Sequence, residues 1–381
     1  MRALVMGSNA VLILNVVQAL GAAGAEADVI SDWHAPRVRY SRYCRRYNRV
    51  PRGSLHESLP GSVDWGLEQY CRDNDISVVI PADLATTLSI ARLERSHLPL
   101  FPIASADVLE TLHDKWRFHL LLSKLGVRVP PTELLDVHHP EACSLSFPVL
   151  IKPRANEGGT GIVRCDTPLQ LAAAAAEART EHPNESWLVQ SMIRGHDVDI
   201  SVLADRGELV AFTIQRDEAH DKKQFLIDER LRAAAAAIVR ATQFHGLAHF
   251  DMRVAADSGD VYAIECNPRV WGSLPYSVWA GVNFIELGCQ IARGRRPSTP
   301  DAPTEQVWHQ GIAPRRMLRA LLQGRTAPAD MKGATLASWQ QAHTDPLPQL
   351  LGQLTESSED WLRQRIAPVL RVMDTPVLPA N

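Results

Sequence analysis

The sequence predicts a mixed α/β protein built from several domains. A chain of 381 residues is long enough for two or three domains. Near its start, short apolar runs alternate with a segment of helical spacing, which is typical of a parallel sheet covered by helices. Later, two strand-like segments flank a short turn, which is typical of an antiparallel hairpin. The expected fold class is therefore α/β and α+β, with a Rossmann-like domain at the N-terminus.

The composition argues against several classes of protein. A hydrophobic fraction of 45% and a charged fraction of 22% are ordinary for a globular chain. The chain has 40 Lys and Arg and 43 Asp and Glu, so it carries no excess of positive charge. We therefore expect no nucleic-acid partner. No apolar run reaches about 18 residues, so we expect no membrane span. The 6 cysteines form no CxxC pair, so we expect reduced thiols and a cytoplasmic location.

The first elements are a strand, a turn, a helix and two further strands. They cover residues 3–6, 7–9, 11–22, 27–30 and 77–81. The turn after the first strand lacks GxGxxG, the fingerprint of dinucleotide binding. We therefore interpret residues 1–108 as a Rossmann-like domain that does not bind NAD.

The middle of the chain predicts both helices and strands. We expect helices over 106–125, 167–181 and 228–242, and strands over 148–153, 187–192, 200–204 and 209–215. Thr167 and Pro168 suit the N-cap and first position of a helix. The expected second domain spans 109–300. Beyond a Pro-rich linker, residues 301–381 form a mostly helical extension, with helices near 317–322 and 361–373.

The strongest candidate site lies on a predicted hairpin around residues 257–259. A three-residue loop there pairs Ala256 with Asp260, so that Asp251 lies opposite Glu265 on a polar face. The remaining expected pairs are His249–Asn267, Phe250–Cys266, Met252–Ile264, Arg253–Ala263 and Val254–Tyr262.

Two opposed carboxylates pose a physical problem. Directly paired side chains have Cβ atoms about 4.5–5.5 Å apart, and like charges at that distance repel. A divalent cation such as Mg²⁺ would resolve the repulsion, and Asn267 would add a third oxygen ligand. The alternative is a solvated polar face with one carboxylate protonated or paired to Arg253. A slip of one residue in the turn would separate Asp251 from Glu265.

Five motifs occur in an order that resembles the ATP-grasp superfamily. They are Asp114-Lys115, PVLIKP at 148–153, EGGTGI at 157–162, LVQSMIRG at 188–195 and ECNPR at 265–269. The similarity covers about residues 1–300. The segments NPRVWGS at 267–273 and AGV at 280–282 resemble a carboxylate–amine ligase-like branch. The resemblance implies an ATP-grasp domain over 109–300, with a lid subdomain at about 133–200.

The resemblance also implies roles for individual residues. Lys115 and Lys152 would contact the ATP phosphates, and Gly158 and Gly159 would lie in the flexible loop over them. The adenine-binding hinge would include Gln190, Ser191 and Ile193, with backbone N–H and C=O groups of Ser191 and Ile193 facing the base. Asp197, or alternatively Asp199, would bind the ribose. Magnesium ligands would be Asp251, Glu265 and Asn267, and Arg269 and Lys152 would be catalytic.

The charged segment at 216–223 and the histidines are further candidates for the site. Arg216 or Lys222 could meet the γ-phosphate, but we favour a solvated charged loop over 216–223. The histidines lack the spacing of metal ligands, so we interpret them as surface or core residues.

The resemblance implies an ATP-dependent ligase that joins a carboxylate to an amine. An acyl phosphate would form, with release of ADP and phosphate, and the cation would be Mg²⁺ or alternatively Mn²⁺. Two other interpretations stay open, a bicarbonate-using carboxylase of the same fold and a catalytically inactive ATP-binding regulatory protein. The expected partners are small-molecule substrates, and a homodimer is an open alternative.

Overall fold

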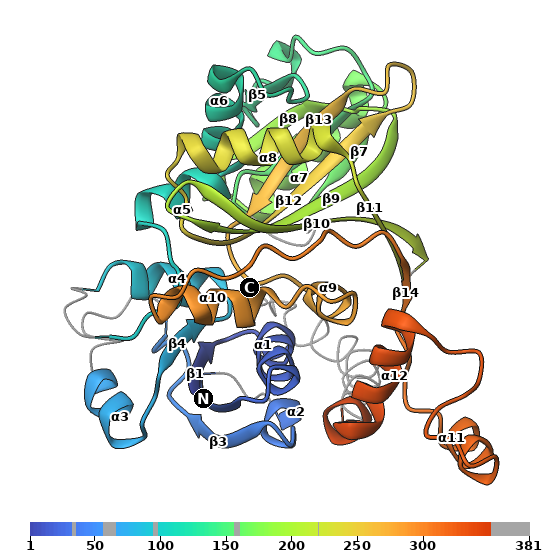
Figure 1. Cartoon of the computed structure of the whole chain (residues 1–381). Helices are drawn as coiled ribbons and strands as arrows, with labels where there is room; N and C mark the ends of the chain where they lie inside the picture. Colours follow the sequence, from blue (N-terminus) through green and yellow to red (C-terminus); the bar gives the residue numbers. More distant parts are fainter. Residues whose placement is uncertain (33–35, 56–65, 94–97, 156–160, 220, 352–381) are drawn as a thin grey trace, which may run out of the picture.

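The described part of the chain forms three β-sheets with helices packed around them (Figure 1). The computed structural model describes residues 1–32, 36–55, 66–93, 98–155, 161–219 and 221–351. The expected C-terminal helix at 361–373 lies outside these residues. Among the described helices, none is long and apolar enough to cross a membrane.

The N-terminal sheet is parallel, with strand order β3-β2-β1-β4. Its strands are β1 (Arg2–Gly7), β2 (Glu26–Ser31), β3 (Cys44–Arg49) and β4 (Val78–Pro81), and its helices are α1 (Ala10–Ala22), α2 (Pro36–Arg39), α3 (Leu67–Asp73) and α4 (Leu84–Ala91). Sequence analysis did not predict β3, because its sequence CRRYNR lacks an apolar pattern. A polar strand is tolerated at this position, since β3 is the edge of the sheet.

The central sheet has six strands in the order β13-β12-β9-β10-β11-β14, all paired antiparallel. They are β9 (Gly195–Asp205), β10 (Glu208–Ala219), β11 (Lys222–Leu226), β12 (Gly246–Ala255), β13 (Val261–Asn267) and β14 (Gln306–Trp308). Arg206 and Gly207 join β9 to β10 with φ of 47° and 89°, as a type I′ turn requires. The edge strand β14 comes from the C-terminal segment.

A smaller antiparallel sheet, β5-β8-β6-β7, faces the central one across a cleft. Its elements are β5 (Thr132–Leu135), η1 (Pro140–Ala142), β6 (Val149–Pro153), β7 (Val163–Cys165), α7 (Pro168–Glu181) and β8 (Trp187–Ser191). Thr167 caps α7 by accepting a hydrogen bond from the Gln170 N–H, and Pro168 is the first helical residue. Both features of α7 were predicted.

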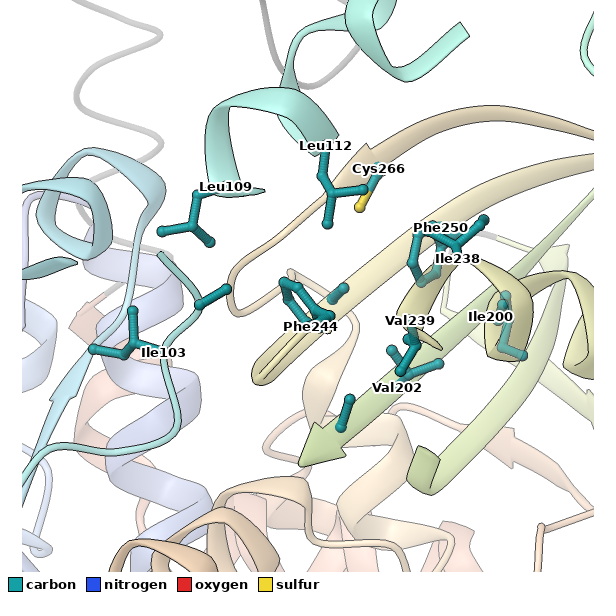
Figure 2. Packing of buried hydrophobic residues seen from close by; sticks show 14 of the residues in the cluster. Ile103, Leu109, Leu112, Ile200, Val202, Ile238, Val239, Phe244, Phe250 and Cys266 are labelled. Atoms are coloured by element: carbon teal, nitrogen blue, oxygen red, sulfur yellow. The ribbon is translucent and has the colours of Figure 1, made fainter. Parts of the chain in front are cut away.

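Period-two alternation gives the central sheet one apolar and one polar face near the cleft. Figure 2 shows Ile200 and Val202 of β9 and Phe250 of β12 packed against Ile238 and Val239 of α8 (Glu229–Ala241). Residues at the intervening positions of β9 and β12 point to the other side. The hydrophobic core under α8 therefore fixes the polar residues on the cleft side.

The hairpin β12–β13 differs from the predicted register at its far end. Asp251 lies opposite Glu265, and the pairs His249–Asn267 and Phe250–Cys266 are confirmed. Beyond them the structure pairs Met252–Ala263, Arg253–Tyr262 and Val254–Val261, so the predicted pairs Met252–Ile264, Arg253–Ala263 and Val254–Tyr262 are wrong.

The error comes from the loop and from a β-bulge. The Ala255 N–H donates to the Asp260 carbonyl, so the loop is longer than the predicted 257–259. This slip alone would have moved the two acids to opposite faces. Ile264, left without a partner where the register shifts, compensates for it and restores the pairing of Asp251 with Glu265.

The predicted helix over 106–125 is two helices, α5 (Ala106–His113) and α6 (Lys115–Leu125). Asp114 interrupts the helix with φ −70° and ψ 110°, and its carboxylate accepts hydrogen bonds from the Trp116 and Arg117 N–H groups, both at 3.0 Å. The Arg154 Nε donates to both Asp114 oxygens at 2.8 and 2.7 Å. This clamp holds the start of α6 against the end of β6.

Within residues 268–351, four further helices follow the hairpin. They are α9 (Leu274–Trp279), α10 (Phe284–Ala292), α11 (Pro314–Leu322) and α12 (Gly333–Thr344). In Figure 1, α9 and α10 lie between the N-terminal sheet and the central sheet. Trp271 and Phe284 join the core of the N-terminal domain, which links the two parts by apolar packing.

We predict that Asp114→Ala lowers the free energy of unfolding by about 1–3 kcal/mol, since it removes a helix cap and the partner of Arg154. The control is Thr167→Ala, which removes only a cap and costs about 1 kcal/mol. Chemical denaturation of both variants gives the comparison. An Asp114 effect no larger than that of Thr167 would contradict the clamp.

The loss of unfolding free energy in Asp114→Ala should depend on pH. Partial burial alone would raise the pKa of this carboxyl, but Arg154 and the backbone N–H groups of Arg117 and Trp116 lower it below 3.8. The ionised form is therefore favoured by folding, and its contribution to stability is present above pH 3.8. The difference between wild type and Asp114→Ala should shrink as the pH falls below about 4.

Candidate functional site

A cleft of about 420 Å³ lies between the smaller sheet and the polar face of the central sheet. Its walls come from strands β6, β8, β9, β10, β12 and β13. The predicted site residues that line it are Lys152, Gln190, Ser191, Ile193, Asp197, Asp251 and Glu265. Segments from 152 to 265 thus meet in one place, although Gly158 and Gly159 lie outside the described residues.

Lys152 is a buried cation at the base of the cleft. Its side chain comes from β6, the residue is 1% exposed, and its Nζ donates a 2.8 Å hydrogen bond to the Gln190 Oε1. Gln190 is oriented in turn by a 2.8 Å bond from its Nε2 to the Thr132 Oγ1. Burial lowers the pKa of Lys152 to about 8, although Glu265 and Asp251 oppose that shift. The cleft therefore holds an ammonium that lacks its normal hydration.

Lys115 approaches the same place from the start of α6. Its Nζ lies 3.3 Å from the Glu265 Oε2. Its position follows from the Asp114–Arg154 clamp, because the Lys115 N–H also donates to the Arg154 carbonyl at 3.1 Å. Two lysines from separate elements therefore flank one carboxylate.

Asp251 and Glu265 behave as an interacting pair. The pKa of Asp251 is raised well above 3.8, first by burial and then by the charge of Glu265. Burial also acts to raise the pKa of Glu265, but Lys115, Asp251 and Lys152 lower it below 4.5. The two pKa values are thus shifted in opposite directions, as expected for two carboxylates held close together. This half-buried pair of oxygen ligands is suited to a divalent cation.

Asn267 and Arg269 lie just beyond the pair. Asn267 pairs with His249 across the hairpin, and its Oδ1 accepts a 3.2 Å hydrogen bond from the Arg269 Nη2. Arg269 also donates from Nη1 to the Val270 carbonyl at 2.6 Å. The positive charge of Arg269 opposes the rise in the pKa of Asp251 and contributes to the lowered pKa of His249. The structure therefore brings Arg269 near the predicted metal ligands.

The hinge after β8 is organised by Arg253. Its Nε donates to the Ile193 carbonyl at 2.6 Å, its Nη2 donates to the Gly195 carbonyl at 2.9 Å, and its Nη1 pairs with Asp197. A Cβ on Gly195 would come within 1.9 Å of the Val254 carbonyl oxygen, so the close packing of the hinge requires glycine.

Some of the hinge backbone groups predicted to face the adenine already have hydrogen-bond partners. The Ser191 N–H donates to the Pro131 carbonyl at 2.9 Å, and the Ile193 carbonyl accepts from Arg253, so these two groups are already engaged. Within the described part of the chain, the Ile193 N–H has no hydrogen-bond partner. Asp197, the predicted ribose ligand, has a side chain that is 73% exposed and ion-paired with Arg253.

A second group of polar residues lies at the cleft. Asp199, predicted as the alternative ribose ligand, lines it together with Asp217, which was not predicted, and Lys223 pairs with Asp217. Burial raises the pKa of Asp199 to about 7. His249 is 8% exposed, and burial together with Arg269 and Lys223 lowers its pKa to about 3. His249 faces the site and does not merely fill the core.

The expected loop over 216–223 is instead the end of one strand and the start of the next, although 217–219 and 221 are exposed as expected. Arg216 and Asp217 end β10, and Lys222 and Lys223 begin β11. Arg216 pairs with Glu218, and the Lys222 Nζ lies 5.0 Å from the centre of the Trp308 ring. Neither Arg216 nor Lys222 lines the cleft.

Arg253→Ala should loosen the hinge, because it removes the contacts to Ile193, Gly195 and Asp197. We expect faster hydrogen exchange of the backbone amides at 192–197, by about tenfold or more. The matched control is Arg128→Ala, which removes an exposed ion pair to Asp260 on the same hairpin. Equal exchange in the two variants would show that Arg253 does not order the hinge.

Two comparisons of sequence with known proteins agree with this geometry. Residues 183–312 match the family model described as ATP-grasp in the biosynthetic pathway with Ter operon. The chain is 26% identical over 240 residues to the arginine-specific large chain of carbamoyl phosphate synthase from Bacillus subtilis (strain 168), with 58% of this chain and 22% of the relative covered. The chain thus spans about a fifth of the length of that relative.

Solved structures share the fold over most of the chain. An N5-carboxyaminoimidazole synthetase from Staphylococcus aureus covers 79% of both chains, with a TM-score of 0.61 and 15% identity. The biotin carboxylase domain of 2-oxoglutarate carboxylase from Hydrogenobacter thermophilus, solved as a dimer with MgADP, ADP and bicarbonate, covers 79% of this chain and 72% of that one (TM-score 0.59, 19% identity). The L-amino acid ligase from Bacillus licheniformis covers 76% and 73% (TM-score 0.56, 18% identity).

The family model spans all six strands of the central sheet, β9 to β14. Residues 183–312 are therefore similar to an ATP-grasp family, and the chain shares its fold with solved structures that cover 76–79% of it.

Proposed function

We propose that this protein is an ATP-dependent ligase that joins a carboxylate to an amine and releases ADP and phosphate. The observation that carries the proposal is that Lys152, Asp251 and Glu265 line one cleft, with the Lys115 Nζ 3.3 Å from the Glu265 Oε2. Two cations suit phosphate oxygens, and two opposed carboxylates suit a divalent cation. A nucleotide triphosphate with its metal satisfies both requirements.

The residues of the chain have separate tasks in this proposal. Lys115 and Lys152 neutralise phosphate oxygens as point charges. The Ile193 N–H, which has no partner within the described part of the chain, donates to the adenine edge, and Arg253 holds the hinge around it. Asp197 lines the cleft and is the proposed ribose ligand. Because the groups are fixed before the substrate binds, catalysis depends on positioning and electrostatics.

Asp251, Glu265 and Asn267 would hold Mg²⁺. Their oxygen atoms fit a hard cation. Burial and then the charge of Glu265 raise the pKa of Asp251, and a cation would balance that charge. When bound, Mg²⁺ would neutralise charge on the phosphate oxygens. Arg269, the proposed catalytic arginine, would bind oxygens of the transferred phosphoryl group or of the acyl phosphate.

The chemistry requires two steps. A substrate carboxylate oxygen attacks the γ-phosphorus of ATP, the bond to the β-phosphate oxygen breaks, and ADP leaves. The amine nitrogen then attacks the carbonyl carbon of the acyl phosphate, phosphate leaves, and the amine loses a proton. Residues 133–200, the proposed lid, would exclude water and so protect the acyl phosphate.

A second cavity suggests where the acid and the amine bind. It has a volume of about 800 Å³ and lies between α1, α9 and α12, lined by residues that include Asn15, Tyr276 and Gln341. Lys223 contacts residues of both cavities. It pairs with Asp217 of the cleft, and its Nζ lies 5.8 Å from the centre of the ring of Tyr276, which lines the second cavity. We propose that the substrates enter through this cavity, between the Rossmann-like domain at 1–108 and the ATP-grasp domain.

The second candidate function is a bicarbonate-using carboxylase. It is favoured by the names of three matched proteins, which are a carbamoyl phosphate synthase, a carboxyaminoimidazole synthetase and a biotin carboxylase. The ligase is favoured by the likeness to the L-amino acid ligase and by the segments at 267–273 and 280–282. The biotin carboxylase domain is named a dimer, which supports the expectation of a homodimer for this chain.

The deciding experiment measures ADP and phosphate release over a panel of carboxylates and amines. The ligase predicts ADP formation that needs both an acid and an amine, and a product with a new C–N bond detected by mass spectrometry. Asp251→Asn should lower the rate by about 100-fold or more, since it removes a charged ligand. AMP release would contradict the mechanism, bicarbonate-dependent ADP release would select the carboxylase, and ATP binding without turnover would select the regulatory alternative.

Lys152 gives the nucleotide affinity a pH dependence. Its pKa of about 8 means that the side chain is half deprotonated at pH 8 before binding, and nearby phosphates favour the charged form. Binding of metal-free ADP should therefore take up about half a proton at pH 8, where the ADP phosphates are already ionised. Calorimetry in two buffers of different ionisation enthalpy measures this uptake.

The matched variants are Lys152→Met and Lys222→Met. Lys152→Met should abolish the proton uptake and weaken ADP binding by about tenfold or more. Lys222→Met should change neither, because the Lys222 side chain packs over Trp308 away from the cleft. Proton uptake that persists in Lys152→Met would show that another group titrates.

A further inference from the structure

We propose that Asp199, His249 and Asp251 form a second cation site, beside the one assigned to Asp251, Glu265 and Asn267, and that it binds a transition metal such as Mn²⁺. The inference extends the proposed function, because both sites share Asp251 and the same cleft. It rests on that function only for the role of the metal, since metal binding can be measured without turnover.

The backbone register brings these three residues together. On β12, His249 and Asp251 are two positions apart and therefore point to the same face of the sheet. On β9, Asp199 lies directly opposite Asp251, and Ser201 lies opposite His249. One ligand atom from each of Asp199, His249 and Asp251 lies within 4.8 Å of the other two. This spacing lets a single cation contact all three.

The imidazole of His249 is held in an orientation suited to a metal ligand. Its Nδ1 lies 2.9 Å from the Ser201 Oγ, and its ring stacks on Trp271 with centroids 5.6 Å apart and an interplanar angle of 14°. Its Nε2 then points toward the acids, 3.3 Å from the Asp251 Oδ1 and 3.7 Å from the Asp199 Oδ2. A hydrogen-bonded Nδ1 that leaves Nε2 for the metal is the usual arrangement of a ligating histidine.

The charges around the two acids are unevenly balanced. Glu265 has Lys115 at 3.3 Å. Over the described residues, the ion-pair contacts of Asp199 and Asp251 within 4 Å are both to His249, which balances them only when protonated. Lys223 and Arg269 act on Asp199 and Asp251 without a printed ion pair to either acid, so a cation between the two acids would balance them at contact distance.

The ligand set indicates the class of metal. Mg²⁺ prefers oxygen ligands alone, whereas a nitrogen ligand with two carboxylates suits Mn²⁺, Fe²⁺, Co²⁺ or Zn²⁺. Three protein ligands leave positions open for water or a phosphate oxygen. The site would therefore make this cleft respond to Mn²⁺ differently from Mg²⁺.

The test uses Mn²⁺ as the probe and the full chain without nucleotide. Pulsed electron paramagnetic resonance detects the coupling of Mn²⁺ to a directly bound nitrogen. Wild type should show this coupling, and His249→Gln should lose it. Asn267→Ala should keep it, since Asn267 belongs to the other site, and so should His309→Gln, which changes a histidine of the second cavity.

A second variant, Ser201→Ala, tests the proposal if His249→Gln fails to fold. Ser201→Ala keeps all three ligands but removes the hydroxyl that orients the ring, and it should weaken Mn²⁺ binding by about tenfold. Wild-type protein without nitrogen coupling would overturn the proposal, as would a coupling that persists in His249→Gln or unchanged affinity in Ser201→Ala. Loss of ligase activity with any substrate panel would leave these readouts intact, so the two proposals fail separately.

Discussion

The pairing of Asp251 with Glu265 across β12 and β13 is the constraint on which the site depends. Two half-buried carboxylates held side by side carry a cost that only protons, lysines or a metal can offset. The pair exists because Ile264 bulges out of the ladder and corrects a one-residue slip made at the turn. A small irregularity of the backbone thus decides whether the hairpin can bind a cation at all.

The surrounding structure supports this pair from several directions. The apolar packing of Phe250 under α8 fixes the face to which Asp251 points. The clamp between Asp114 and Arg154 joins α6 to β6 and so places two lysines near Glu265. Each support comes from a different sheet or helix, and the cleft is chemically complete only when all of them are folded together.

Much of this could be predicted from the sequence, because strong local patterns were present. The apolar alternation of β12 and β13 predicted the opposition of Asp251 and Glu265, and Thr167 predicted the start of α7. The bulge at Ile264 has no such signal, since it follows from loop contacts. Asp199 was missed as a partner of Asp251 because the strand was expected to begin at 200, whereas it begins at Gly195. Polar strand ends such as Lys223 look like loops until tertiary pairing is known.

The central claim is that one cation is shared by Asp251 and Glu265 and contacts the nucleotide. It is tested most directly by crystals grown with Mn²⁺ and a non-hydrolysable ATP analogue, using the anomalous scattering of manganese. The account predicts an anomalous peak in contact with both carboxylates and with the analogue's phosphates. An ordered analogue in the cleft with no manganese peak between Asp251 and Glu265 would contradict it.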